Sequence, residues 1–178
     1  MRIVVIGSGR IGGTVTRRLT QLGHDVVVAN AGGPETLEDL VRETGATATS
    51  TAEVPTAEPG EPESMWTAEQ LGPPVVKALT TSTARSLQEH ARPRGAADRI
   101  GAPVAGDDEE PKQRVVDLVD ALRFEAFDAG NLADSSRQQP GTPVYTADLP
   151  LGAARGAIAD ARPEHGTAWR DALRATTP

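Results

Sequence analysis

The chain has 178 residues and a formal net charge of −7 at pH 7, and this acidic composition argues against a nucleic-acid partner. Cysteine is absent, which excludes disulfides, thiolate metal sites and a cysteine nucleophile. No run approaches the roughly 18 apolar residues of a membrane span, and the first residues do not resemble a signal peptide, so we expect a cytoplasmic protein with no membrane partner.

The first predicted element is a strand at Arg2–Ile6, whose β-branched and apolar residues are typical of a strand buried on both faces of a parallel sheet. It runs into Gly-Ser-Gly-Arg-Ile-Gly at residues 7–12, which matches G-x-G-x-x-G, and then into a helix. In such a motif the first glycine makes a tight turn, the second admits a pyrophosphate, and the third lets the helix lie close to the strand. The N-terminus of the helix offers free N–H groups to phosphate.

A second apolar strand at Asp25–Asn30 follows this helix, so the motif has the strand–loop–helix–strand context that a dinucleotide site requires. We therefore predict that a dinucleotide binds here. The alternative is a tight turn that binds no ligand. The residues predicted to contact the cofactor are Gly7, Ser8, Gly9, Arg10, Ile11, Gly12, Asn30, Ala31 and Gly32.

A second helix is predicted to begin with Pro34 at its first position and to end at Gly45, followed by a third, weaker strand at Ala46–Thr51. The character of the chain then changes. Residues 55–72 form a linker rich in proline and glutamate, with a short helical turn predicted at Met65–Leu71.

Elements of both kinds return after the linker. The predicted strands are Val75–Leu79, Arg99–Ala105 and Phe124–Ala129, and the predicted helices are Thr83–Ala91 and Glu109–Leu122. Asp107 or Asp108 is expected to cap the second of these helices. The acidic run at 107–110 is interpreted as helix-start chemistry, with a metal site as the minor alternative.

The last part of the chain is polar and rich in turn residues. Asn131–Tyr145 predicts either a surface loop or a loop that lies over a site or a partner subunit. Residues 150–178 are expected to form a tail, helical over Leu151–Ala161 and frayed beyond Pro163.

Several of these segments, taken in order, resemble the family of coenzyme F-420-dependent NADP oxidoreductases. The matching segments are Ile6–Leu22, Val27–Glu35, Val75–Leu79, Pro103–Asp108 and Asp128–Tyr145. The resemblance covers residues 1–53 and 73–149. It implies an α/β, Rossmann-like, doubly wound and mostly parallel sheet, an NAD(P)-binding domain over residues 1–149, and NADP as cofactor, with NAD as the alternative.

The chain departs from this family at the loop after the second strand. The family usually carries there a Ser-Arg pair that holds the 2′-phosphate of NADP, whereas this chain has Ala31 and Gly32. An NAD-specific protein would show an acidic residue where this chain has Asn30. Neither signature is intact, so we expect weak discrimination between NADP and NAD.

A second departure is that about two central strands of the family have no counterpart between the third strand and Val75, so the sheet is expected to be abbreviated. We predict that Val75–Leu79 fills the vacant place beside Arg2–Ile6, in parallel, because a buried strand should not leave its backbone groups unpaired. The alternative is a strand from a second copy in a homodimer.

The resemblance implies an oxidoreductase that transfers hydride between NADP(H) and a small-molecule partner: the deazaflavin coenzyme F-420, a flavin or a carbonyl compound. No side chain is evident as a catalytic acid, base or nucleophile, and cofactor-to-cofactor transfer does not require one. The alternatives are a diverged relative that only binds nucleotides and an enzyme of another class on the same fold.

Overall fold

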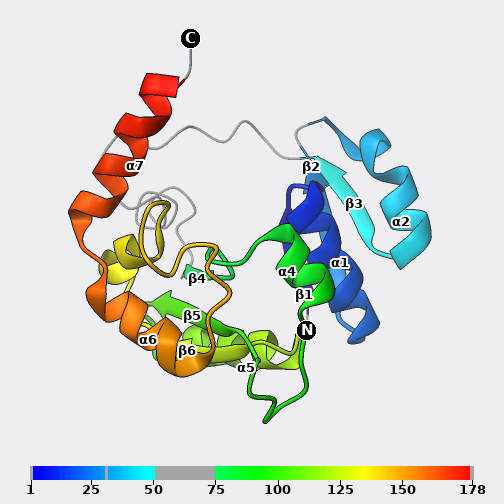
Figure 1. Cartoon of the computed structure of the whole chain (residues 1–178). Helices are drawn as coiled ribbons and strands as arrows, with labels where there is room; N and C mark the ends of the chain where they lie inside the picture. The colour runs from blue at the N-terminus through cyan, green and yellow to red at the C-terminus, as the bar shows by residue number, and fades with distance from the viewer. Residues whose placement is uncertain (1, 31, 51–74, 177–178) are drawn as a thin grey trace. The chain divides into compact units, whose positions relative to one another are not determined.

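The computed structural model describes residues 2–30, 32–50 and 75–176, and the chain divides into two compact units. Unit 1 comprises Met1–Thr56 together with Leu87–Glu89, and unit 2 comprises Ala57–Ser86 together with His90–Pro178. Each unit contains one three-stranded sheet (Figure 1). The linker at 55–72 and the helical turn predicted at Met65–Leu71 lie outside the described residues.

Unit 1 is a parallel sheet of strand order β1-β2-β3 with its connecting helices. The central strand β2 is the most deeply buried, with Val26 at 2% and Val28 at 0% exposure. Leu19 and Leu37 from the connecting helices complete the core. The elements are β1 (Arg2–Ile6), α1 (Arg10–Gln21), β2 (Asp25–Asn30), η1 (Pro34–Leu37), α2 (Glu38–Thr44) and β3 (Thr47–Ser50).

The helix ends of unit 1 lie where the glycines predict them. Gly23 follows α1 with φ +79°, and Gly45 caps α2 in the left-handed region with φ +72°. The end of α4 (Ala84–Glu89) also belongs to this unit, and Gln88 Nε2 donates a hydrogen bond to Thr14 Oγ1 of α1 at 3.0 Å.

The prediction that β1 is buried on both faces is wrong. Val5 is buried, with 9% exposure, whereas Val4 and Ile6 are 59% and 61% exposed. Successive side chains of a strand point to opposite faces, so these values mean that one face of β1 is covered and the other is open. In its sheet β1 pairs only with β2, which makes it an edge strand among the described residues.

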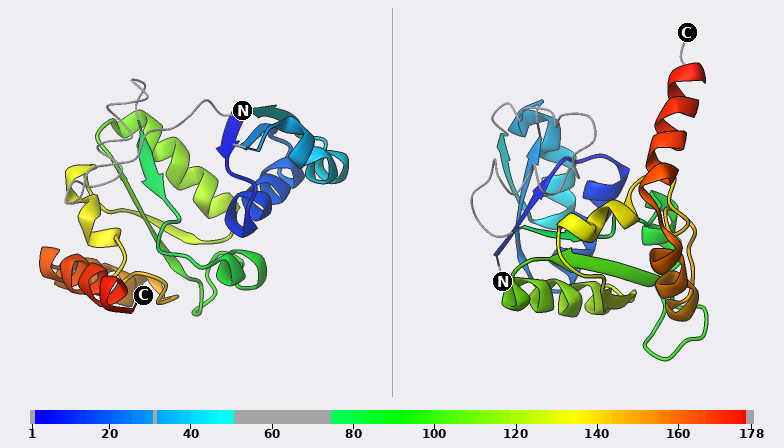
Figure 2. Two further views of the ribbon diagram at one scale, coloured as in Figure 1. Left: turned by 90° about the horizontal axis from the view of Figure 1, so that it is seen from above. Right: turned by 90° about the vertical axis from the view of Figure 1, so that its left-hand side faces the viewer.

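Unit 2 combines a mixed sheet of order β4-β5-β6 with helices (Figure 2). Helix α5 contacts all three strands, and α6 contacts β5. A cluster of Phe127, Val144, Ala154, Ala157 and Ile158 forms part of the core. The remaining elements are β4 (Val76–Ala78), β5 (Gly101–Gly106), α5 (Glu109–Ala121), β6 (Glu125–Asp128), η2 (Ala133–Gln138), α6 (Leu151–Asp160) and α7 (Pro163–Thr176).

The predicted parallel pairing of Val75–Leu79 with β1 is also wrong. Strand β4 pairs instead with β5, antiparallel, with Val76 opposite Gly106 and Ala78 opposite Val104. Strand β5 is buried along its whole length and carries β6 on its other edge, so its free edge requires a partner for its backbone groups. The fold is nevertheless α/β and Rossmann-like, and three of the four pairings between the described strands are parallel.

The start of α5 differs in detail from the prediction. Asp108 does occupy the N-cap position, but its side chain makes no capping hydrogen bond. The neighbouring Asp107 instead accepts a hydrogen bond from the backbone N–H of Leu132 through Oδ1, at 2.9 Å. The acidic run therefore serves partly to hold the loop before η2.

The prediction that the chain frays beyond Pro163 is wrong, because α7 covers Pro163–Thr176 and contacts η2. A Cβ atom at Gly141, whose φ is +91°, would lie 2.5 Å from the carbonyl oxygen of His165 and 2.6 Å from Cβ of Trp169. Only glycine allows this close approach. The approach gives the alanine-rich tail a tertiary contact that its sequence does not reveal.

A buried guanidinium joins three segments of unit 2. The side chain of Arg99 is 2% exposed and donates to Glu125 Oε2 at 2.6 Å and to Asp120 Oδ1 at 2.8 Å. Arg94 pairs with the same Asp120 from solvent. Burial acts to raise the pKa of Asp120, but the hydrogen bonds from Arg94 and Arg99 outweigh it and hold that pKa below its usual value.

Replacing Arg99 with Met should lower the free energy of unfolding by about 2 kcal/mol at neutral pH, because Glu125 and Asp120 both lose their buried cation and Asp120 keeps only the exposed Arg94. The folded-state pKa of Asp120 is depressed, so this stabilisation is present above about pH 4 and is lost as the pH falls through the folded value. Urea unfolding at neutral pH and near pH 3 checks both statements.

The exposed Arg94→Met is the matched control, because it removes a partner of the same carboxylate and should change little. An equal loss for the two variants, or an Arg99→Met deficit that persists at low pH, would contradict the assignment.

Candidate dinucleotide-binding site

The turn between β1 and α1 has the backbone geometry that the glycine motif predicts. Gly7 has φ +93°, and its N–H donates to the carbonyl oxygen of Ala29 on β2 at 2.8 Å. A Cβ atom at Gly12 would lie only 1.8 Å from the carbonyl oxygen of Gly7. Gly12 is therefore the position at which α1 crosses the turn in direct backbone contact.

Gly9 differs from Gly12 because it faces open space. It occupies the N-cap position of α1 with φ −64°, and no atom of the described residues lies within 4 Å of a Cβ placed there. No side chain in the described part of the chain caps this helix, and its first turn holds no acidic residue. The N–H groups at the start of α1 are thus left for an anionic ligand, with the positive end of the helix dipole behind them.

A second loop, between β2 and η1, meets the glycine turn through one carboxamide. Asn30 Nδ2 donates to Ser8 Oγ at 3.0 Å and to Thr36 Oγ1 at 3.1 Å, and Asn30 Oδ1 accepts from the N–H of Gly32 at 3.2 Å. Thr36 Oγ1 donates in turn to the carbonyl oxygen of Gly33 at 2.7 Å. The ends of β1 and β2 are in this way tied into one polar cluster.

The structure thus brings together most of the predicted cofactor contacts. Gly7, Ser8, Gly9, Gly12, Asn30 and Gly32 lie at the two loops, and Arg10 and Ile11 are exposed in the first turn of α1. Ala31 lies outside the described residues. Thr36 was not predicted, because a threonine after Pro-Glu carries no motif and only the fold places its hydroxyl beside Asn30.

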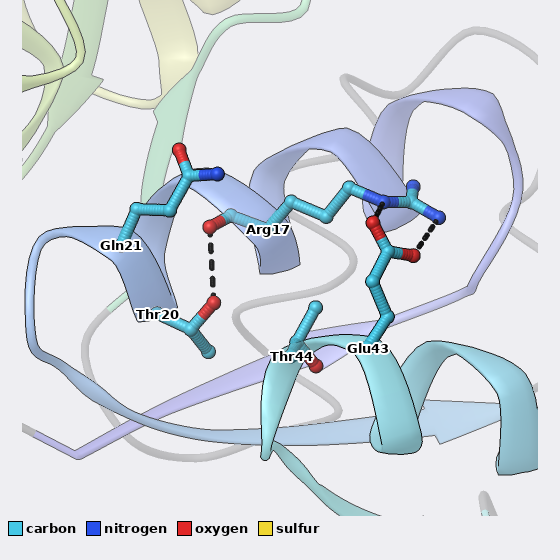
Figure 3. A pocket seen from close by; sticks show the side chains of 5 residues that line it. All are labelled: Arg17, Thr20, Gln21, Glu43 and Thr44. Atoms are coloured by element: carbon cyan, nitrogen blue, oxygen red, sulfur yellow. Dashed lines mark hydrogen bonds and ion pairs between the residues drawn. The ribbon is translucent and has the colours of Figure 1, made fainter.

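A separate hollow lies between α1 and α2 and is lined by five residues (Figure 3). Within it Arg17 donates to both oxygens of Glu43, at 2.8 and 2.7 Å, which raises the pKa of Arg17 and lowers that of Glu43. Thr20 donates to the carbonyl oxygen of Arg17. The lining residues come from the C-terminal half of α1 and from the end of α2, whereas the glycine turn lies at the start of α1, so the hollow is distinct from the candidate dinucleotide site.

The arrangement in unit 2 that comes nearest to a catalytic triad is Ser86, His90 and Asp148. Ser86 Oγ donates to Asp148 Oδ2 at 2.6 Å, and His90 Nδ1 lies 3.5 Å from the same oxygen. Ser86 is 1% exposed and donates its hydrogen bond to the carboxylate and not to the imidazole, so the described residues include no base that activates it as a nucleophile. With Thr83, the N-cap of α4, the group is a helix-capping network.

Two further features are absent from the part of the chain that the structure describes. It holds no cluster of three or more His, Cys, Asp or Glu side chains suited to a metal ion. None of its helices combines the length and apolar character needed to span a bilayer. The residues described likewise identify no catalytic side chain.

A three-stranded parallel sheet with a glycine turn between its first strand and first helix is half of a Rossmann-like dinucleotide-binding fold. Residues 2–61 match the sequence model of the family described as NADP oxidoreductase, coenzyme F-420-dependent, which confirms the predicted resemblance over the first of its two segments. The chain is also 40% identical to YjhV of Escherichia coli (strain K12) over 63 residues. That match covers 35% of this chain and 46% of YjhV, so it spans about half the length of that relative.

Solved structures extend the likeness in fold. The protein SMa0349 of Sinorhizobium meliloti superposes with a TM-score of 0.69 at 21% identity, over 83% of this chain and 94% of its own. A provisionally described F-420-dependent NADP reductase of Arthrobacter sp. FB24 gives 0.59 at 19%, over 90% and 96%. A variant of the imine reductase of Myxococcus stipitatus, in complex with NAD+, gives 0.50 at 13%, over 73% and 54%. At these identities the likeness establishes the Rossmann-like fold.

Gly12→Ala should destabilise unit 1 by about 2–3 kcal/mol, because the added methyl group overlaps the carbonyl oxygen of Gly7 and the backbone must move. Gly9→Ala is the matched control, since the same methyl group at Gly9 meets no atom within 4 Å. Thermal unfolding followed by circular dichroism compares the two. Equal melting temperatures would show that α1 does not cross the turn as described.

Proposed function

We propose that this protein is an NAD(P)-dependent oxidoreductase that binds a nicotinamide dinucleotide at the glycine turn. The observation that carries the proposal is the open, uncapped N-terminus of α1 beside Gly9, next to two glycines that the turn itself requires. The pyrophosphate would lie against the N–H groups of this helix start. The match of residues 2–61 to an NADP oxidoreductase family supports the same assignment.

The proposed chemistry is hydride transfer between the nicotinamide and a second small molecule. The candidates are the deazaflavin coenzyme F-420, a flavin or a small carbonyl compound. In such reactions the protein mainly positions the reactive carbon of the cofactor against its partner, so a site without a dedicated acid or base is sufficient. Absorbance of the reduced nicotinamide, followed with a panel of these acceptors, tests this step.

A second candidate is a nucleotide-binding relative without dehydrogenase activity. It is favoured by one specific observation, which is that the family match ends at residue 61, before the strands of unit 2. Tight binding of a nicotinamide nucleotide without turnover of any acceptor would favour this candidate over the first.

Gly9→Val should weaken dinucleotide binding by more than about 100-fold, or about 2.7 kcal/mol, because the branched side chain occupies the space left for the pyrophosphate. The fold should survive, since the φ of −64° at Gly9 is ordinary and nothing crowds the position. Calorimetric titration with NADPH, NADP, NADH and NAD measures the change, and the melting temperature provides the control. Failure of the unmutated protein to bind any of the four at millimolar concentration would refute the proposal.

Nucleotide preference can be tested by adding a cation at Gly32. Gly32→Arg should favour NADPH over NADH by about tenfold, or about 1.4 kcal/mol, through a charge-assisted contact to the 2′-phosphate. A Cβ at Gly32 would lie 3.1 Å from Thr36 Cγ2, so the change should be combined with Thr36→Ser, which removes that methyl group and keeps the hydroxyl. Gly32→Gln in the same background is the uncharged control. An unchanged NADPH to NADH ratio would place this loop away from the ribose.

A further inference from the structure

The polar cluster at Asn30 has a fixed hydrogen-bond direction. The N–H of Gly32 can only donate, so the side-chain atom that it meets, at 3.2 Å, is the carbonyl oxygen of Asn30. The atom that faces Ser8 and Thr36 must then be the amide nitrogen, which can only donate. The backbone therefore determines the orientation of this carboxamide.

Both hydroxyl groups consequently act as acceptors toward Asn30. The Thr36 hydroxyl donates its own hydrogen bond to the carbonyl oxygen of Gly33 at 2.7 Å. Ser8 has no such acceptor among the residues that the structure describes, since its Oγ is bonded to Asn30 alone. Ser8 is thus left with a proton to donate, at the edge where the ends of β1 and β2 meet and where dinucleotide folds place the adenosine ribose.

We propose that Asn30 is a positioning residue that makes Ser8 a hydrogen-bond donor to an acceptor oxygen of the bound dinucleotide. The inference rests on the proposed function and adds to it the hydrogen-bond polarity of the adenosine end. A ribose hydroxyl oxygen and a 2′-phosphate oxygen share the required chemistry. Each can accept the proton that Ser8 has left to give.

An acidic residue at position 30 would reverse the direction of these hydrogen bonds. A carboxylate has no proton to give, so Ser8 and Thr36 would both have to donate to it. The Ser8 hydroxyl would then donate its hydrogen bond to the protein and not to a ligand. Thr36 would have to give up its hydrogen bond to the carbonyl oxygen of Gly33. Asn30→Asp introduces the residue that dinucleotide folds commonly use to bind the NAD ribose, yet in this chain it should weaken binding of NADH as well as NADPH.

The experiment measures dissociation constants for NADH and NADPH by calorimetry in the full chain and in four variants: Ser8→Ala, Asn30→Asp, Asn30→Ala and Ser8→Ala with Asn30→Asp. We expect Ser8→Ala and Asn30→Asp each to weaken binding by about tenfold. Asn30→Ala leaves the Ser8 proton free and should lie between the unmutated protein and Asn30→Asp. Melting temperatures of all variants check the fold.

The double variant distinguishes positioning from a merely structural effect. If Asn30→Asp acts by accepting the hydrogen bond that Ser8 would otherwise donate to the ligand, then Ser8→Ala costs little further affinity in the Asn30→Asp background. The acceptor is identified from Ser8→Ala, which leaves the charge of the site unchanged. A larger loss for NADPH than for NADH in this variant assigns the acceptor to the 2′-phosphate, and equal losses assign it to an oxygen that both nucleotides share.

Additive losses, or an Asn30→Asp variant that binds NADH as tightly as Asn30→Ala or more tightly, would overturn the inference while leaving the proposed function intact. A separate result bears on the proposed function alone: failure of the unmutated chain to bind either nucleotide.

Discussion

The contact between Gly12 and the carbonyl oxygen of Gly7 is the constraint on which unit 1 depends. A hypothetical Cβ at 1.8 Å from that oxygen shows that the helix touches the turn backbone to backbone. This closeness brings the first N–H groups of α1 to the end of β1, while the neighbouring bond from Gly7 N to Ala29 O fixes the turn on β2. These two contacts together position the start of α1 beside the ends of β1 and β2.

Local sequence chemistry predicted the parts of this arrangement that depend on residues close together in the chain. The glycine turn, the strand at Asp25–Asn30 and the helix ends at Gly23 and Gly45 are all confirmed, because each follows from backbone freedom or from a short apolar run. The link from Asn30 to Ser8 and Thr36 could not be predicted, because it joins the glycine turn, the end of β2 and η1, whose meeting is determined by strand register.

Pairing between distant strands was the weakest part of the prediction. An apolar run such as Val75–Leu79 shows that a strand forms but does not specify which edge receives it. The buried strand β5 offers a complementary edge in the same unit, and Gly106 leaves room there for Val76, whose Cγ2 would lie 3.2 Å from a Cβ at that glycine. The position of β4 is thus determined by the free edge of β5, whose backbone groups require a partner. It does not take the place beside β1 that the family's missing strand would occupy.

The two units also differ in what constrains their polar groups, and this bears on where function resides. In unit 2 two buried cations form ion pairs within the unit: Arg99 with two carboxylates, and Lys112 with Asp128 at 2.8 Å. The buried atoms without a hydrogen-bond partner among its described residues are Arg99 Nε, both side-chain polar atoms of Gln138, and Asp148 Oδ1, and they are not open to a ligand from solvent. In unit 1 the helix start at Gly9 is uncapped, and among the described residues the Ser8 proton has no acceptor. Polar groups that a fold positions at its surface, without a partner among the described residues, are accessible to a ligand. The glycine turn and the Asn30 loop have this property together, and they form the surface against which a dinucleotide would lie.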